Sequence, residues 1–196
     1  ARQRADFQNN RYLTDSSELL PWCRESYKEL WDIMVSAYGE DYFIASVTLD
    51  VPPTEWPRID ALDPPFYKDR LLHRIVNNIA VPLERFNVED TIFDYGTYSW
   101  GDREAIRYHV AGREIYFQPR PNVTEEVVLL YVPQAVLDTL TSEIDWSAEQ
   151  WAEYIVIDLA IKMRRKEQSD TTDLAMEKEA MRRRVETMAA PRDLLR

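Results

Sequence analysis

Few residues of this chain have the types and spacing that catalysis requires. There are two histidines, His73 and His109, and one cysteine, Cys23, and none of the three stands at metal-ligand spacing from another. We expect both histidines to occupy ordinary positions on strand faces. The four glycines are too scattered for a dinucleotide fingerprint or a phosphate-binding loop. The sequence therefore predicts no catalytic residue, no metal site and no cofactor.

Asp158 is the most suggestive carboxylate, because it stands within the most apolar helical segment, where an unpaired charge would be costly. Lys162 follows one helical turn later, so an Asp–Lys pair along the helix is the simplest interpretation. The alternative is a buried acid that contacts a neighbouring subunit.

Two basic triplets could meet nucleic acid, Arg164–Lys166 and Arg182–Arg184. Glu179 precedes the second triplet and Glu186 follows it within about one turn, so most of its charges can be paired along their own helix. The chain also carries 35 acidic against 24 basic residues, a net charge of −11, which repels a polyanion. This pattern favours a self-paired, partner-facing helix over DNA contact.

The charge is uneven along the chain. Residues 1–150 carry 14 basic and 26 acidic side chains, a balance of −12, whereas residues 151–196 carry 10 and 9, a balance of +1. The near-neutral, arginine-rich end is suited to an acidic partner surface.

Three helices are predicted from apolar periodicity. The first spans about 17–38, with start signals at Asp15–Ser17 and a stop at Gly39. The second begins at a capping box formed by Ser147 and Gln150 and is apolar nearly all round, which indicates cover on more than one side. The third, about 171–189, is amphipathic and should end at Pro191. Its stripe consists of Leu174, Met181, Val185 and Met188.

Strands are predicted between the first and second helices. Alternating residues at about 43–49 are followed by a proline-rich loop at 52–65. Further strands should lie at about 71–77, 105–111, 114–118 and 126–132. Gly112 and the prolines after residue 118 suggest two successive hairpins, so 105–118 and 126–132 are expected to form one antiparallel sheet separate from the helices.

The predicted fold class is α+β: a helical bundle, made of an N-terminal helix and a C-terminal helix pair, with an inserted small antiparallel sheet. We expect a single domain over 1–196, with helical parts at about 1–40 and 146–190, a β insertion at about 41–134 and a tail at 190–196. The longest apolar run has six residues, far below the roughly 20 that cross a bilayer, so no membrane is expected. A single cysteine favours a reducing compartment.

Several segments, taken in order, resemble the head-to-tail adaptor proteins of tailed bacteriophages. They are RQRADFQN, LTDSSEL with ELWDIMVSAYGEDYF, GREIYFQPRPN with LLYVPQ, WAEYIVIDLAIKMRRKEQSD and MAAPRD. The likeness spans nearly the whole chain, although about 52–104 matches poorly.

This resemblance implies a non-enzymatic virion structural protein, made in the host cytoplasm and located at the capsid vertex. It would form a homo-oligomeric ring, usually of twelve copies, beneath the portal protein. The ring would join the capsid to tail or nozzle proteins and extend the channel through which DNA leaves without sequence-specific binding. The net negative charge of residues 1–150 and the lack of a predicted catalytic site agree with that role.

Two sets of residues are candidates for contacts in such an assembly. The portal interface is assigned to Met181, Val185, Met188, Arg192 and Arg196. Subunit packing is assigned to Trp151, Ile155, Asp158 and Lys162. Two alternatives stay open: a metal-dependent hydrolase or nuclease built on scattered carboxylates, and a bacterial protein–protein adaptor with no virion role.

Overall fold

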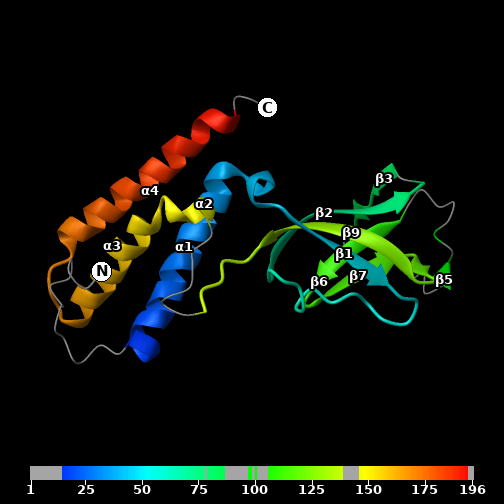
Figure 1. Cartoon of the computed structure of the whole chain (residues 1–196), viewed down its shortest axis with the longest axis horizontal. Helices are drawn as coiled ribbons and strands as arrows, with labels where there is room; N and C mark the ends of the chain where they lie inside the picture. The colour runs from blue at the N-terminus through cyan, green and yellow to red at the C-terminus, as the bar shows by residue number, and fades with distance from the viewer. Residues whose placement is uncertain are drawn as a thin grey trace. The chain divides into compact units, whose positions relative to one another are not determined.

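The computed structural model describes residues 15–77, 79–86, 97–98, 100, 106–138 and 146–193. Helices and antiparallel strands are both present, so the fold is α+β as predicted (Figure 1). The chain divides into two compact units, a helical unit of Ala1–Tyr42 with Ala135–Arg196 and a β unit of Phe43–Gln134. That the whole chain acts as one adaptor domain stays a prediction.

The helical unit begins with a π-helical turn, Asp15–Leu19, which leads directly into α1, Leu20–Tyr38. Pro21 lies in the first turn of α1, directly after the π-helical turn, and its lack of an N–H removes one hydrogen bond close to the start of the helical segment. Gly39 ends the helix with a φ of 81°, a conformation that glycine adopts without a steric penalty. The first helix therefore lies where periodicity predicted it.

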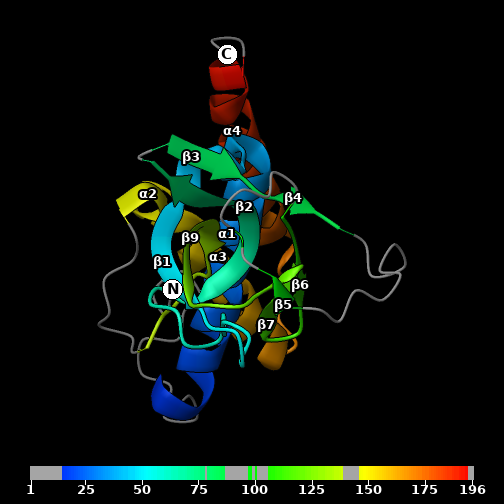
Figure 2. The same ribbon diagram turned by 90° about the vertical axis from the view of Figure 1, so that its right-hand side faces the viewer.

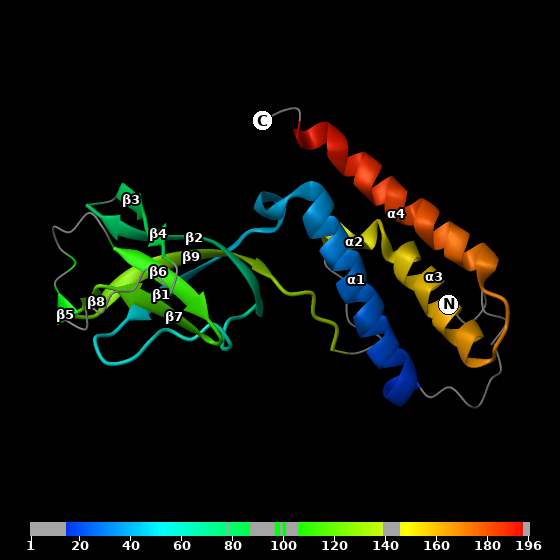
Figure 3. The ribbon, with the colours of Figure 1, turned by 180° about the vertical axis from the view of Figure 1, so that it is seen from behind.

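Three further helices complete this unit: α2, Trp146–Glu149; α3, Ala152–Lys166; and α4, Thr172–Asp193. Ser26 of α1 lies opposite Asp158 of α3, and Glu29 lies opposite Tyr154, so these two helices are antiparallel. Helix α4 returns antiparallel to α3 and runs beside α1 in the same direction (Figure 3). Side chains from both neighbours bury most of α3, as its all-round apolar pattern predicted.

Two predicted helix limits are wrong. The chain does not form one helix from Ser147, because Gln150 and Trp151 interrupt it and α3 starts without a side-chain cap. The amide of Trp151 bonds to the carbonyl of Ala148 and that of Tyr154 to Trp151, a tighter turn that buries the indole. Helix α4 continues past Pro191 to Asp193, since a proline near a helix end removes one hydrogen bond and keeps a helical φ.

The β unit contains a four-stranded sheet with the order β1–β9–β2–β3 and only antiparallel neighbours (Figure 2). The strands are β1, Ala45–Val51; β2, Phe66–Val76; β3, Ile79–Pro82; and β9, Glu125–Pro133. The proline-rich stretch between β1 and β2 is irregular, as predicted.

A three-stranded sheet consists of β4, Glu84–Arg85; β6, Arg107–Ala111; and β7, Glu114–Gln118. Strands β6 and β7 form the predicted hairpin around Gly112, whose φ is 61°. A short parallel pair joins β5, Thr97–Tyr98, to β8, Arg120–Pro121.

The second predicted hairpin is wrong, because β7 does not pair with β9 and the two strands lie in different sheets. Pro119 and Pro121 lack the N–H that a ladder needs, so the chain leaves β7 before it can return along it. Strand β9 instead pairs with β1 on one side and β2 on the other. The two sheets share one apolar core, which includes the fully buried Trp100.

Candidate functional site: a buried charge cluster between three helices

The residues with catalytic potential lie apart from one another. His73 is in β2, and His109 is in β6 with Nδ1 3.1 Å from the carbonyl oxygen of Phe86, so both occupy strands as predicted. Burial raises the pKa of Cys23, which makes it a poor nucleophile at neutral pH. Across the residues that the structure describes, no three histidine, cysteine or acidic side chains group as they would to hold a metal ion.

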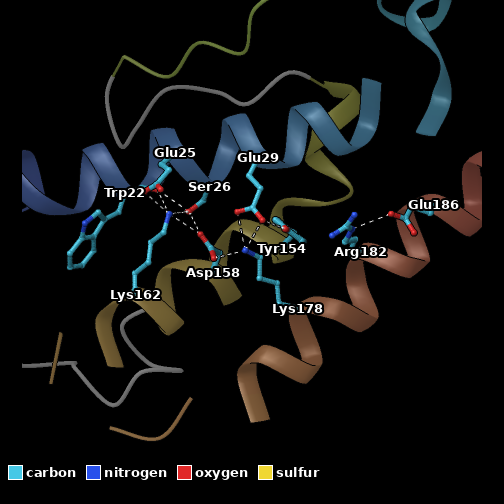
Figure 4. Close-up of polar contacts among 10 residues, drawn as sticks. All are labelled: Trp22, Glu25, Ser26, Glu29, Tyr154, Asp158, Lys162, Lys178, Arg182 and Glu186. Carbon is cyan, nitrogen blue, oxygen red and sulfur yellow. Dashed lines mark hydrogen bonds and ion pairs between the residues drawn. The ribbon is translucent and has the colours of Figure 1, made fainter. Parts of the chain in front are cut away.

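The densest polar cluster surrounds Asp158, which is 4% exposed (Figure 4). Its carboxylate lies 2.9 Å from Nζ of Lys162, one turn along α3, so the predicted pair is confirmed. Nζ of Lys178 in α4 lies 2.7 Å away, and Oγ of Ser26 in α1 lies 2.5 Å away. One carboxylate therefore joins all three long helices of the unit.

Two glutamates of α1 accept further hydrogen bonds from the two lysines. Nζ of Lys178 also contacts both carboxylate oxygens of Glu29, at 2.8 and 2.9 Å, and Tyr154 donates its hydroxyl to the same glutamate at 2.8 Å. Nζ of Lys162 lies 2.9 Å from the carboxylate of Glu25. Each lysine thus bridges the buried aspartate and a more exposed glutamate of α1.

The cluster holds its groups in fixed protonation states. Burial alone would raise the pKa of Asp158, but hydrogen bonds from Lys178, Ser26 and Lys162 outweigh it and hold that pKa below its usual value. Burial would lower the pKa of Lys178, yet its bonds to Asp158 and Glu29 raise it overall. Burial, and then the bond to Glu29, raise the pKa of Tyr154. None of these three groups is tuned to exchange a proton near neutral pH, so this geometry suits positioning rather than acid–base chemistry.

A cavity of about 230 Å³ adjoins the cluster. Both signs of charge line it, among them Arg165, Lys178 and Arg182 with Glu29 and Glu179. This mixture gives the cavity no preference for an anion or a cation.

The second basic triplet is paired along its own helix. Nε of Arg182 lies 3.1 Å from Glu186, and Nε of Arg183 lies 3.1 Å from Glu179. The guanidinium carbon of Arg184 lies 5.9 Å from the ring centroid of Trp151. The predicted self-pairing is confirmed.

The four residues assigned to subunit packing are covered within a single chain. Trp151 and Ile155 are 4% and 3% exposed, and Asp158 and Lys162 belong to the charge cluster. Their burial already has an explanation inside the helical unit, so the structure gives the subunit-packing prediction no support.

The residues assigned to the portal interface follow one face of α4 and differ in exposure. Val185 is fully buried, Met181 packs partly against the helical core, and Met188 is 57% exposed. Arg192 lies in α4, but its side chain and all of Arg196 fall outside the described residues.

Lys178 is the stripe member that periodicity missed. With it, the inner face of α4 has the heptad-like spacing four, three, four, three: Leu174, Lys178, Met181, Val185 and Met188. A charged residue on a charged helix looks exposed in sequence, and only its position between Leu174 and Met181 signals that it faces the bundle.

Comparison with known proteins adds no relative. No protein-family model matches this chain, and no curated protein matches it in sequence. Among the described helices, none is long and apolar enough to cross a membrane.

Proposed function

We propose that this protein is a non-enzymatic head-to-tail adaptor of a tailed bacteriophage. Copies would form a homo-oligomeric ring, about twelve in number by the resemblance, beneath the portal and would extend the DNA channel toward the tail. The ordered likeness of its segments supports this proposal, and so does a buried cluster that is arranged to position helices. A net charge of −11 suits a conduit through which a polyanion slides without sticking.

The observation that carries the proposal is a change of exposure along the inner face of α4, here called the seam. The seam consists of Leu174, Lys178, Met181, Val185 and Met188. Leu174 packs with residues of α3, Lys178 bonds to α1 and α3, and Val185 is fully buried. The next position on the same face, Met188, is 57% exposed. Among the described side chains of this face, the first exposed one after Val185 is therefore Met188.

Helix α1 ends close to the part of α4 where this exposure begins. Ala37, in the last turn of α1, and Glu186 of α4 line the same cavity of about 430 Å³, and α1 stops at Tyr38. Helix α4 continues for seven further residues, to Asp193. Met188 is an adaptable apolar contact for a partner, and we assign that partner as the portal ring.

A matched pair of substitutions on α4 tests this assignment. Met188→Asp places a charge on the seam, whereas Met176→Asp changes an equally exposed methionine, 61% exposed, that lies off the seam. We expect Met188→Asp to weaken binding to purified portal roughly tenfold, a loss of about 1.4 kcal/mol, and Met176→Asp to leave it unchanged. Both variants should fold normally, because neither side chain is buried.

The measurement is equilibrium binding to portal, with electron microscopy of the portal–adaptor complex to detect a ring. Equal binding by Met188→Asp and the wild type would place the portal contact elsewhere. Failure of the wild-type protein to bind portal at all would refute the adaptor role.

A further inference from the structure

The four-stranded sheet of the β unit has two open edges. Strands β1 and β3 are outermost in the order β1–β9–β2–β3, and within the described ranges no other strand pairs with their outer sides. Natural edge strands are protected by charged residues, above all lysine, and also by proline and by short length. Strand β3, Ile79–Pro82, is short and ends in a proline but has no charged residue, and β1, Ala45–Val51, has only Asp50. These edges are weakly guarded against a further strand.

The strand directions allow the two edges to meet. Strand β9 is antiparallel to β1 and to β2, and β3 is antiparallel to β2, so β3 and β1 run in opposite directions. A second copy placed beside the first in the same orientation would bring its β1 antiparallel to β3. The extended sheet would then be antiparallel throughout, with no need to turn the second copy over.

The existing ladder suggests which residues would meet. Leu49 pairs with Val127, Val127 with Arg74, and Arg74 with Val81, so these four residues form one row across the sheet. If the row continues without stagger, Val81 of one copy lies opposite Leu49 of the next, and Ala80 lies opposite Asp50.

Exposed apolar side chains flank both edges. Ile75 and Ile79, at the β2–β3 end, are 58% and 65% exposed, and Ile44, just before β1, is 39% exposed. Pairing of the two edges would remove part of this apolar surface from water, which favours association.

The two halves of the sheet also differ in charge. Strands β1 and β9 carry three acidic side chains and no basic one, whereas β2 and β3 carry three basic side chains and one acidic one. Pairing of two β1 edges would bring two acidic halves together, whereas pairing of a β1 edge with a β3 edge joins an acidic half to a basic half. This complementarity favours a head-to-tail contact over a symmetric dimer, and head-to-tail contacts generate rings when the rotation closes.

We propose that the occupant of each edge is a second copy of this chain, with β3 of one copy paired to β1 of the next. This inference rests on the proposed ring-forming function, because a ring needs a head-to-tail contact between copies. It does not depend on portal as the partner.

Disulfide crosslinking in a Cys23→Ser background tests the contact. The full-length variant with both Ala80→Cys and Asp50→Cys should form a ladder of covalent multimers on mild oxidation, seen on a non-reducing gel. Either cysteine alone should give nothing above a dimer, since head-to-tail pairing offers each copy only one half of the bond. Absence of the ladder in the double variant overturns the inference.

A gatekeeper substitution provides the second measurement. In the double-cysteine background, Ile79→Lys should abolish the ladder, because it guards the β3 edge with a charge. Val123→Lys is the matched control, since Val123 is 54% exposed in the same unit and lies in the turn before β9. Equal loss of the ladder in both variants would show that the crosslinks do not report edge pairing.

The two proposals fail separately. A ladder without portal binding would retain the edge contact and refute the portal role. Portal-bound rings whose subunits give no ladder would retain the adaptor and refute the edge contact.

Discussion

Replacement of Asp158 by alanine is expected to destabilise the helical unit by about 3 kcal/mol. Removal of one member of a buried ion pair typically costs 3–5 kcal/mol, because the opposite charge stays buried without its partner. Here the substitution deprives three donors of an acceptor: Ser26, Lys162 and Lys178. The lower end of the range applies, since each lysine keeps a glutamate and remains about a fifth exposed.

Urea unfolding followed by far-ultraviolet circular dichroism measures this change, because the helical unit dominates that signal. Glu179→Ala is the matched control. It breaks the 3.1 Å ion pair between Glu179 and Arg183, whose side chains are 49% and 74% exposed respectively. The free energy of unfolding should therefore change by less than about 0.5 kcal/mol. A loss below about 1 kcal/mol for Asp158→Ala would refute the view that the cluster holds the three helices together.

The pH dependence gives an independent check on the same residue. The folded-state pKa of Asp158 lies below its ordinary value of 3.8, so its stabilising contribution is complete above that value. The contribution disappears as the pH falls through the lower, folded-state pKa. The stability difference between wild type and Asp158→Ala should therefore be constant near neutral pH and shrink in acid. A difference that grows on acidification would contradict the direction of the shift.

Two further predictions concern single residues. Gly39→Ala should destabilise the protein by about 1–3 kcal/mol, measured by thermal unfolding, because its φ of 81° and ψ of 152° lie where alanine is strained although space for the methyl is open; an unchanged melting temperature would contradict this. Trp100→Phe should destabilise the β unit by about 2 kcal/mol, since it removes the indole donor to Pro119 and leaves a void, and hydrogen exchange in β6 and β7 should rise accordingly. Unchanged exchange there would argue against that role for the indole.

The sequence predicts the helices well because their signal is local. Apolar spacing locates α1 and α4, and Gly39 marks a real helix end. Strand pairing, in contrast, depends on residues that are far apart in the sequence. The alternation that identifies β9 cannot say that it pairs with β1 and β2, since those partners lie more than 50 residues away in sequence.

The charge cluster is predicted only in part for the same reason. The pair of Asp158 and Lys162 lies within one helix turn and is visible in the sequence. Lys178 and Glu29 join the cluster through helix packing, which periodicity alone does not fix. The adaptor role and the portal contact at Met188 stay predictions, because both concern contacts with other proteins and the fold of a single chain does not test them.

The β unit is inserted between α1 and the other helices, and this order has a consequence for synthesis on the ribosome. The buried face of α1, which includes Tyr27, Leu30 and Met34, acquires its α4 partner only when Val185 has been made. At about 5–20 residues per second, that delay is roughly 7–30 seconds. The β unit is complete well before then and is free to fold first. The nascent chain therefore carries α1 without its α3 and α4 partners until after the whole β unit has been made.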